Sequence, residues 1–211
     1  MLMRNSVYGA LKADIIACRL WPGTELREPD LAAQYAVSRS PIRDALLRLE
    51  ADGLITIVPR QCYRVAPISL RDAEDLLGLR RLLEPEAASQ AARSADTTAL
   101  DALERAVDYT PGTDFIDYNR DFHCALAACA WNRRIADACT SAIEQSDRLV
   151  RVSVAQIEGR QPDNLVAEHR AIVAAIRLRD ARGAARLLRA HIGAAEVRIL
   201  AALRRQAVVA A

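Results

Sequence analysis

The chain has 211 residues, and its 29 Lys and Arg against 27 Asp and Glu give a formal net charge of +2. No stretch approaches the roughly 20 apolar residues of a membrane span, and the N-terminus lacks the apolar run of a signal peptide. Five cysteines, an odd number without a Cys-x-x-Cys pair, predict reduced thiols and exclude a disulfide framework. We therefore expect a cytoplasmic protein with one ordinary domain and a small one.

The small positive excess lies wholly in the first third of the chain. Residues 1–66 carry nine Lys and Arg against seven Asp and Glu, which leaves twenty of each for residues 67–211. Two charges do not indicate nucleic-acid binding unless the basic residues gather on one surface. The pattern of apolar residues also changes after Ala66, and we therefore expect two domains, 1–66 and 67–211.

Residues 1–66 are predicted to form three helices followed by a β-hairpin. Apolar residues at helical spacing place the first helix at about residues 7–20 and a short second helix near residues 29–35. The third helix begins at Ser38, a favourable N-cap residue, and Gly53 ends it with a left-handed residue. Its inward face is predicted to hold Ile42, Ala45, Leu46 and Leu49. The hairpin has strands at residues 54–58 and 63–65, joined by residues 59–62.

From residue 67 onward the pattern is helical throughout. Pro, Gly, Asn and Asp mark the breaks between successive apolar patterns. Six helices are predicted, at about residues 69–94, 97–108, 114–130, 133–158, 164–179 and 182–207. Six helices of this length predict a bundle with a closed interior.

The chain contains three histidines, and each falls on the apolar side of a different predicted helix. His123, His169 and His191 are each spaced three or four residues from Leu or Ile neighbours. A buried imidazole needs polar partners, and a shared divalent cation would satisfy all three at once. The alternative is that they are separate core histidines, each with its own hydrogen bonds.

The third predicted helix carries a second candidate site at its start. Arg39 and Arg43 lie four residues apart on the side opposite its apolar face, with Ser38 and Ser40 beside them. Guanidinium groups and small hydroxyls at a helix N-terminus suit base edges and phosphates. The alternative is an ordinary solvated helix face.

The sequence around this helix favours the DNA-binding hypothesis over the solvated face. Three stretches carry a family resemblance: Pro22-Gly23-Thr24-Glu25-Leu26, Val37-Ser38-Arg39-Ser40-Pro41-Ile42-Arg43-Asp44-Ala45-Leu46 and Gly53-Leu54-Ile55. With their spacing, residues 7–66 resemble the winged helix-turn-helix of GntR-family bacterial transcription regulators. The resemblance implies that the DNA-binding residues are Ser38, Arg39, Ser40, Pro41, Arg43 and, on the wing, Arg60. Two positions depart from the family pattern. Cys62 stands at the wing tip where glycine is usual, and Pro29 stands where some members place a DNA-contacting arginine.

Residues from about 70 to 207 are similar to the helical effector domain of the FadR-like branch of that family. The strings that carry the similarity are Leu79-Arg80-Arg81-Leu82-Leu83-Glu84, Phe122-His123, Glu168-His169-Arg170-Ala171-Ile172 and His191. Six helices resemble the shorter VanR-type variant. The fold class expected is therefore mainly α: an N-terminal winged helix-turn-helix plus a C-terminal all-α helical bundle.

The resemblance also implies a divalent metal, held by an Asp and three His, that catches a carboxylate effector. Asn119 occupies the position of the Asp, four residues before His123, while Asp121 points to another side of the helix. The metal ligands expected are Asn119, His123, His169 and His191, a neutral set that suits Zn²⁺ or Ni²⁺ but binds more weakly than one with a carboxylate. Arg80 matches an effector-binding arginine of the family; the alternative is a surface pair with Glu84 four residues on.

The function expected is that of a metabolite-responsive transcription regulator, a repressor and not an enzyme. It would bind a palindromic double-stranded DNA operator as a homodimer and respond to a small organic acid, with no membrane involved. One alternative is a regulator in which the metal itself is the effector. Another is a metal-dependent hydrolytic enzyme, although no residue stands out as a general base.

Overall fold

The computed structural model describes residues 2–58, 62–154, 163–205 and 209–210. The chain divides into two compact units, one running to Ser69 and joined by the C-terminal strand, the other formed by Leu70–Arg205. Within the described residues, no helix combines the length and the apolar character needed to cross a membrane. Each unit has its own hydrophobic core.

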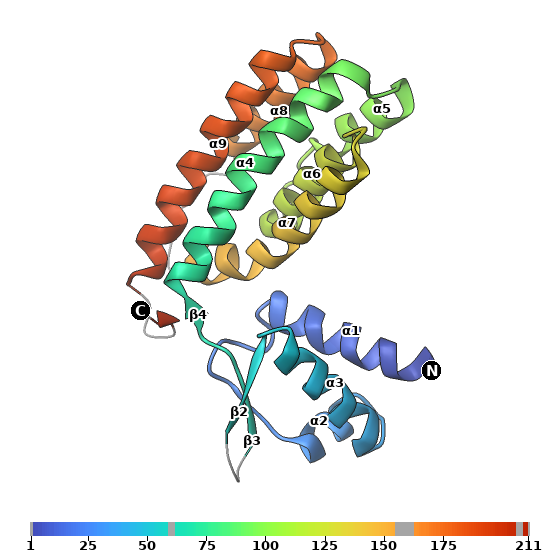
Figure 1. The fold of residues 1–211 in the computed structure, drawn as a ribbon, viewed down its shortest axis with the longest axis vertical. Helices are drawn as coiled ribbons and strands as arrows, with labels where there is room; N and C mark the ends of the chain where they lie inside the picture. Colours follow the sequence, from blue (N-terminus) through green and yellow to red (C-terminus); the bar gives the residue numbers. More distant parts are fainter. Residues whose placement is uncertain (1, 59–61, 155–162, 206–208, 211) are drawn as a thin grey trace. The chain divides into compact units, whose positions relative to one another are not determined.

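The first unit packs three helices around a small apolar core (Figure 1). They are α1 (Leu2–Ile16), α2 (Glu28–Gln34) and α3 (Arg39–Ala51). The predicted inward face of the third helix is confirmed, since Ile42, Ala45, Leu46 and Leu49 are all buried. Gly53 follows α3 with a φ of +72°, the left-handed conformation expected for a residue that ends a helix.

The predicted bounds of the first helix were wrong at both ends. The helix begins at Leu2 and already ends at Ile16, four residues before the predicted end. Cys18 adopts a φ of +52°, and the backbone N–H of Leu20 donates to the carbonyl of Asp14 at 3.0 Å. The chain therefore turns back on the last helical turn before it reaches Trp21. Residues 17–20 were predicted to be helical from their spacing but lie in this turn.

The first unit also contains a three-stranded antiparallel sheet. The predicted hairpin is present as β2 (Ile55–Val58) and β3 (Cys62–Val65), and β1 (Glu25–Leu26) adds to the other edge of β3. Cys62 was predicted in the turn but is the first residue of β3, opposite Val58. The strand β1 was not predicted because two residues are too few to show an alternating pattern. Arg60 lies outside the described residues.

The first unit also contains two short strands that pair in parallel. They are β4 (Ile68–Ser69) and β5 (Val209–Ala210). The last helix was predicted to run to residue 207, but it ends at Leu203, and the chain is extended again at Val209. A two-residue strand near a terminus leaves no periodic signal in the sequence.

The second unit is the predicted bundle of six helices within the described residues. They are α4 (Leu70–Ser94), α5 (Thr97–Ala106), α6 (Phe115–Ala128), α7 (Arg133–Val154), α8 (Asp163–Arg177) and α9 (Ala181–Leu203). Figure 1 shows α4 and α9 side by side in opposite directions. Ion pairs tie them at two levels, Arg81 with Glu196 and Arg204 with Glu74.

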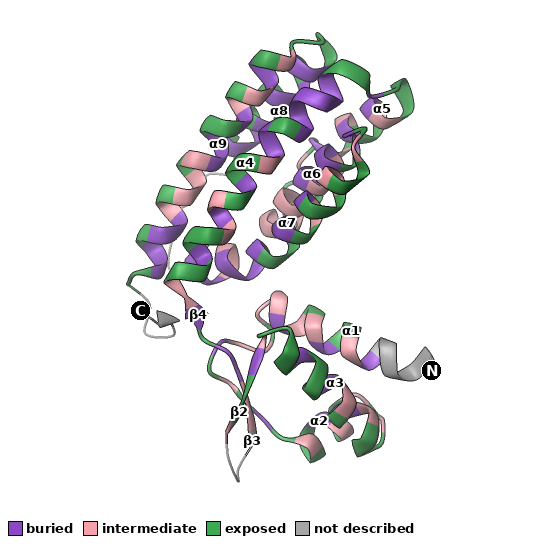
Figure 2. Cartoon of the chain, viewed as in Figure 1, coloured by how far each residue is buried: buried purple, intermediate pink, exposed green. Residues whose placement is uncertain are grey.

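The second half of α4 forms the tightly packed end of the bundle. Ala87, Ala88, Ala91 and Ala92 are completely buried, and Figure 2 shows this part of α4 almost entirely in the buried class. Small side chains let neighbouring helices approach closely, so this half of the bundle leaves little free space. Large residues of the other helices fill the layer around the alanines, among them Phe122, Leu126, Ile172, Ile176 and Leu188.

The cysteines behave as the composition predicted. The four whose side chains are described form no disulfide: Cys18, Cys124, Cys129 and Cys139. Burial raises the pKa of Cys124 to about 11, of Cys129 to about 11 and of Cys139 to about 12. These three thiols therefore stay protonated and act as small apolar residues of the core.

Candidate nucleic-acid interface and metal centre

The start of α3 presents the expected polar side chains to solvent. Ser38, Arg39, Ser40 and Arg43 are exposed, and Pro41 is half-buried. Ser38 has the extended backbone of an N-cap residue, but its hydroxyl makes no capping hydrogen bond. The hydroxyl therefore remains available to a ligand at this helix end.

The Arg43 guanidinium is held by an acid from the preceding helix. Its Nε donates to Glu28 Oε1 at 3.0 Å, and its Nη2 donates to Glu28 Oε2 at 2.9 Å. These hydrogen bonds raise the pKa of Arg43 and lower that of Glu28. No residue of the described segments forms a hydrogen bond or ion pair with the Arg39 side chain, so the two arginines differ. The pairing of Glu28 with Arg43 was not predicted, because no spacing rule connects residues on two separate helices.

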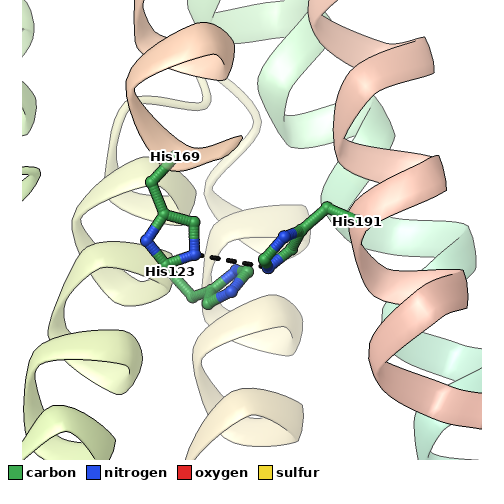
Figure 3. A group of neighbouring side chains, drawn as sticks. All are labelled: His123, His169 and His191. Atoms are coloured by element: carbon green, nitrogen blue, oxygen red, sulfur yellow. Dashed lines mark hydrogen bonds between the residues drawn. The ribbon is translucent and has the colours of Figure 1, made fainter. Parts of the chain in front are cut away.

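The three histidines converge from three helices, as Figure 3 shows. His123 lies on α6, His169 on α8 and His191 on α9, and all three are buried. One ring nitrogen from each lies within 4.8 Å of the others, and His169 Nε2 is 3.3 Å from His191 Nε2. The helical spacing thus identified three residues that meet at one point of the fold.

Two of the imidazoles are oriented by carboxylates at their Nδ1 atoms. His123 Nδ1 lies 2.6 Å from Glu84 Oε2, and His191 Nδ1 lies 2.6 Å from Glu168 Oε2. A carboxylate accepts a hydrogen bond from Nδ1–H, which fixes the tautomer and leaves the lone pair of Nε2 for a metal. Neither Glu84 nor Glu168 was assigned this role from the sequence.

The third imidazole is oriented by a phenol. The Tyr118 hydroxyl lies 3.1 Å from His169 Nδ1 and donates to the carbonyl of Val107, also at 3.1 Å. A hydroxyl has one proton, so the Tyr118 oxygen accepts from His169 Nδ1–H. The Nε2 of His169 therefore also carries a lone pair, and its ring stacks on Phe122 with centroids 3.9 Å apart.

This donor set fits a divalent cation. With Nδ1 protonated on His169 and His191, no proton lies between their Nε2 lone pairs at 3.3 Å, and the lone pairs repel. Tetrahedral zinc with bonds of 2.0–2.1 Å places its ligand nitrogens about 3.3 Å apart. Burial, then the neighbouring histidines, lower the pKa of His169, and burial followed by His123 lowers that of His191 to about 4. These two imidazoles are therefore neutral at pH 7, as metal ligands must be.

Asn119 lies beside this cluster and Asp121 does not. Asn119 is half-buried and lines the same cavity as His123 and His191. Within the described part of the chain, no hydrogen bond engages its side chain. Asp121 has a side chain that is 66% exposed, and it pairs with Arg120. Of these two residues of α6, Asn119 is therefore the one that lines the cavity beside His123.

Arg80 is buried and paired, which corrects the alternative of a surface pair with Glu84. Its Nε donates to Glu84 Oε1 at 2.5 Å, and Oε2 of Glu84 accepts the hydrogen bond from His123 Nδ1–H. Burial would raise the pKa of Glu84, but Arg80 and His123 outweigh it and hold the pKa at about 2. Glu84 is therefore an anion that joins an arginine of the cavity wall to a histidine of the cluster.

A cavity opens beside the histidines at the first half of α4. His123, His191, Asn119 and Arg80 contribute to its wall together with a second arginine, Arg198 of α9. The rest of the wall is apolar, and it includes Leu77, Phe115, Val150, Leu165 and Ile199. No carboxylate lines this cavity among the described residues. The cavity thus combines an apolar wall with groups that attract an anion or hold a cation.

Comparison with known proteins identifies both units. The model of "Bacterial regulatory proteins, gntR family" matches residues 3–65, and the model of the FCD domain matches residues 75–194. The chain is 32% identical to the HTH-type transcriptional regulator BphR of Paraburkholderia xenovorans (strain LB400), over 89% of this chain and 81% of the relative. It is 26% identical to the HTH-type transcriptional repressor RspR of Escherichia coli (strain K12), over 90% of this chain and 86% of the relative.

A solved structure shows the same arrangement of elements. A GntR regulator from Rhodococcus sp. RHA1 superposes with a TM-score of 0.77 at 25% identity, covering 95% of this chain and 99% of that one. The fold class expected from the sequence, a winged helix-turn-helix followed by a helical bundle, is thereby confirmed. The chain belongs to the GntR family of transcriptional regulators, with the C-terminal FCD domain of the FadR-like branch.

Proposed function

We propose that this regulator is a homodimeric repressor that reads a palindromic operator with α3. Ser38, Arg39, Ser40, Pro41 and Arg43 would enter the major groove, and the exposure of the two serines and two arginines supports this placement. Arg60 would contact DNA from the wing. One winged helix reads one half-site, so a palindrome requires two copies of the chain. The dimer would act in the cytoplasm. The name of the relative RspR, a repressor, supports repression.

The second unit, on this proposal, holds Zn²⁺ or Ni²⁺ through Asn119, His123, His169 and His191. The observation that carries it is the orientation of the three imidazoles. One ring nitrogen of each lies within 4.8 Å of the others, while a separate partner holds each Nδ1. Separate core histidines would not need lone pairs that face one another, and a shared cation explains this arrangement directly. A metal bound there would supply a positive centre, and a carboxylate would bind it by displacing Asn119 or as a fifth ligand.

The effector on this proposal is a small organic acid that enters the cavity beside the histidines. Arg80 lines that cavity and stabilises the acid's negative charge at short range, while its Nε stays bonded to Glu84. Effector binding changes operator affinity only if the acid binds the DNA-competent and the DNA-incompetent arrangements of the dimer with different affinities. The two alternatives are a metal sensor and a metal-dependent hydrolase. In a metal sensor the metal alone would change operator binding, and in a hydrolase neither metal nor acid would change it.

Titration of operator binding separates these possibilities. The operator is first selected from random DNA with the full-length protein, and its binding is then measured without metal, with Zn²⁺ and with Zn²⁺ plus small carboxylic acids. We expect metal to stabilise the protein and an acid to change operator affinity. If metal alone produces the whole change, the ion is the effector; if neither acts, the sensing role is wrong.

The DNA-reading assignment is tested with matched arginine variants. Arg39→Ala should reduce the preference for operator over random DNA by about 1–3 kcal/mol, the usual value of a base-contacting arginine. Arg93→Ala, at the exposed end of α4, is the control and should leave that preference unchanged. An Arg39→Ala protein with wild-type preference at the same salt concentration would exclude Arg39 from base reading.

A further inference from the structure

The cavity beside the histidines contains a charged donor that no described group satisfies. Arg198 of α9 is half-buried, and its Nη2 atom is buried without a hydrogen-bond partner. A buried donor on a charged group costs free energy when it is left unpaired. Arg80, the other arginine of the wall, has its Nε paired with Glu84. The two arginines are therefore not equivalent: Arg80 is paired with Glu84 through its Nε, whereas none of the described residues forms an ion pair with Arg198.

The position of Arg198 relative to the histidines follows from the helix. Arg198 lies seven residues after His191 on α9, which is about two turns, or roughly 10 Å, along the same helix face. Between them Ile192 and Ala195 line the same cavity. Helical side chains lean toward the N-terminus, so the guanidinium reaches back in the direction of His191.

An ion pair between α4 and α9 shows which turn of α4 lies next to Arg198. Arg81 of α4 pairs with Glu196 of α9 at 3.1 Å, and the two helices run in opposite directions. Arg198 therefore lies beside the turn of α4 that contains Arg80, about two turns of α9 from His191. Along the cavity wall, the histidine cluster is followed by an apolar stretch and then by the guanidinium of Arg198, which has no ion-pair partner among the described residues.

We propose that Arg198 binds the second acidic group of a dicarboxylate effector whose first carboxylate binds the metal. The proposal rests on the proposed function, since the metal centre supplies one of the two positive positions. A dicarboxylate with a short methylene chain matches this order, because its two carboxylates would face the metal and Arg198 while its methylene groups lie against the apolar stretch. A monocarboxylate would leave the Arg198 donor buried and unpaired.

The test compares diacids with analogues that lack only the second charge. Zinc-loaded full-length protein is titrated calorimetrically with succinate, glutarate and adipate, and with the monoamide of each. We expect at least one diacid to bind about tenfold or more tightly than its monoamide, because a hydrogen bond between ionised groups is about twice as strong as a neutral one. Arg198→Gln should abolish this difference, and Arg198→Lys, which keeps the charge, should retain part of it.

Arg81→Gln is the matched control, since Arg81 has a side chain 52% exposed on α4 and pairs with Glu196. It should keep the wild-type preference for the diacid. The ligand-free Arg198→Gln protein should unfold at a temperature no lower than wild type, because it loses an unpaired buried donor, and its zinc content should not change. A wild-type protein that binds zinc but does not distinguish any diacid from its monoamide overturns this inference alone. A wild-type protein that binds no zinc overturns the proposed metal centre as well.

Discussion

Replacing Tyr118 with phenylalanine removes one oxygen from the outer shell of the histidine cluster and changes no charge. Burial raises the pKa of Tyr118 to about 12, so the phenol is neutral at pH 7. Its oxygen accepts from His169 Nδ1–H and its proton goes to the carbonyl of Val107, both at 3.1 Å. The variant therefore leaves a buried imidazole N–H without an acceptor.

The magnitude follows from these two hydrogen bonds. An unpaired buried donor costs about 1–3 kcal/mol of stability, and we expect the metal-free Tyr118→Phe protein to lose this amount. Removal of a group that orients a metal-binding histidine weakens metal binding by about 10–100-fold. Zinc affinity should fall by this factor, because His169 can then rotate or change its tautomer.

A neighbouring tyrosine provides the control. The Tyr109 ring packs 5.1 Å from that of Tyr118, but its hydroxyl donates at an exposed site to the carbonyl of Thr113. Tyr109→Phe should therefore bind zinc as wild type does. Zinc affinity is measured by competition with a chelating dye, and stability by urea unfolding of metal-free protein. If Tyr118→Phe binds zinc within twofold of wild type, the phenol only packs against the imidazole and the orienting role is wrong.

Three further outcomes follow from the same geometry. Asn119→Asp should tighten zinc binding and weaken binding of glutarate to the zinc-loaded protein, because the ion is better neutralised; calorimetry that shows both affinities unchanged would remove Asn119 from the ligand set. Glu28→Gln should release Arg43 and strengthen binding to random DNA with a steeper salt dependence, and an unchanged salt slope would argue against Glu28 lying near phosphates. Metal-free protein should lose stability on acidification from about pH 6.5 to 4, because the unfolded chain protonates His191 before the folded chain does; His191→Gln should reduce this loss in urea titrations at each pH.

Periodicity in the sequence was sufficient to identify which residues face inward. The inward face of α3 and the meeting of His123, His169 and His191 both follow from apolar residues three and four positions away. Spacing along a helix reports a face of that helix and nothing about the partner that packs on it. Glu84 lies 39 residues before His123, and only the packing of α4 on α6 brings their side chains together.

The same limit explains the other missed contacts. Glu28 and Arg43 lie on separate helices, and Tyr118 reaches His169 across 51 residues of sequence. Short strands escaped detection for a different reason, since β1 and β5 have two residues each. Arg198 appeared in the sequence as one of many arginines, and only the cavity wall distinguishes it.

The unequal halves of α4 have a consequence for how this domain can diversify. The alanines at Ala87, Ala88, Ala91 and Ala92 leave no room for an added methyl group, so substitutions there are expected to cost about 1–3 kcal/mol through overpacking. Leu77, on the first turns of the helix, borders the cavity and tolerates changes of size more readily. Relatives that respond to different acids should therefore vary at such cavity-lining apolar positions while the alanine half keeps the bundle folded. One helix thus separates the part of the protein that can acquire new chemistry from the part that must stay the same.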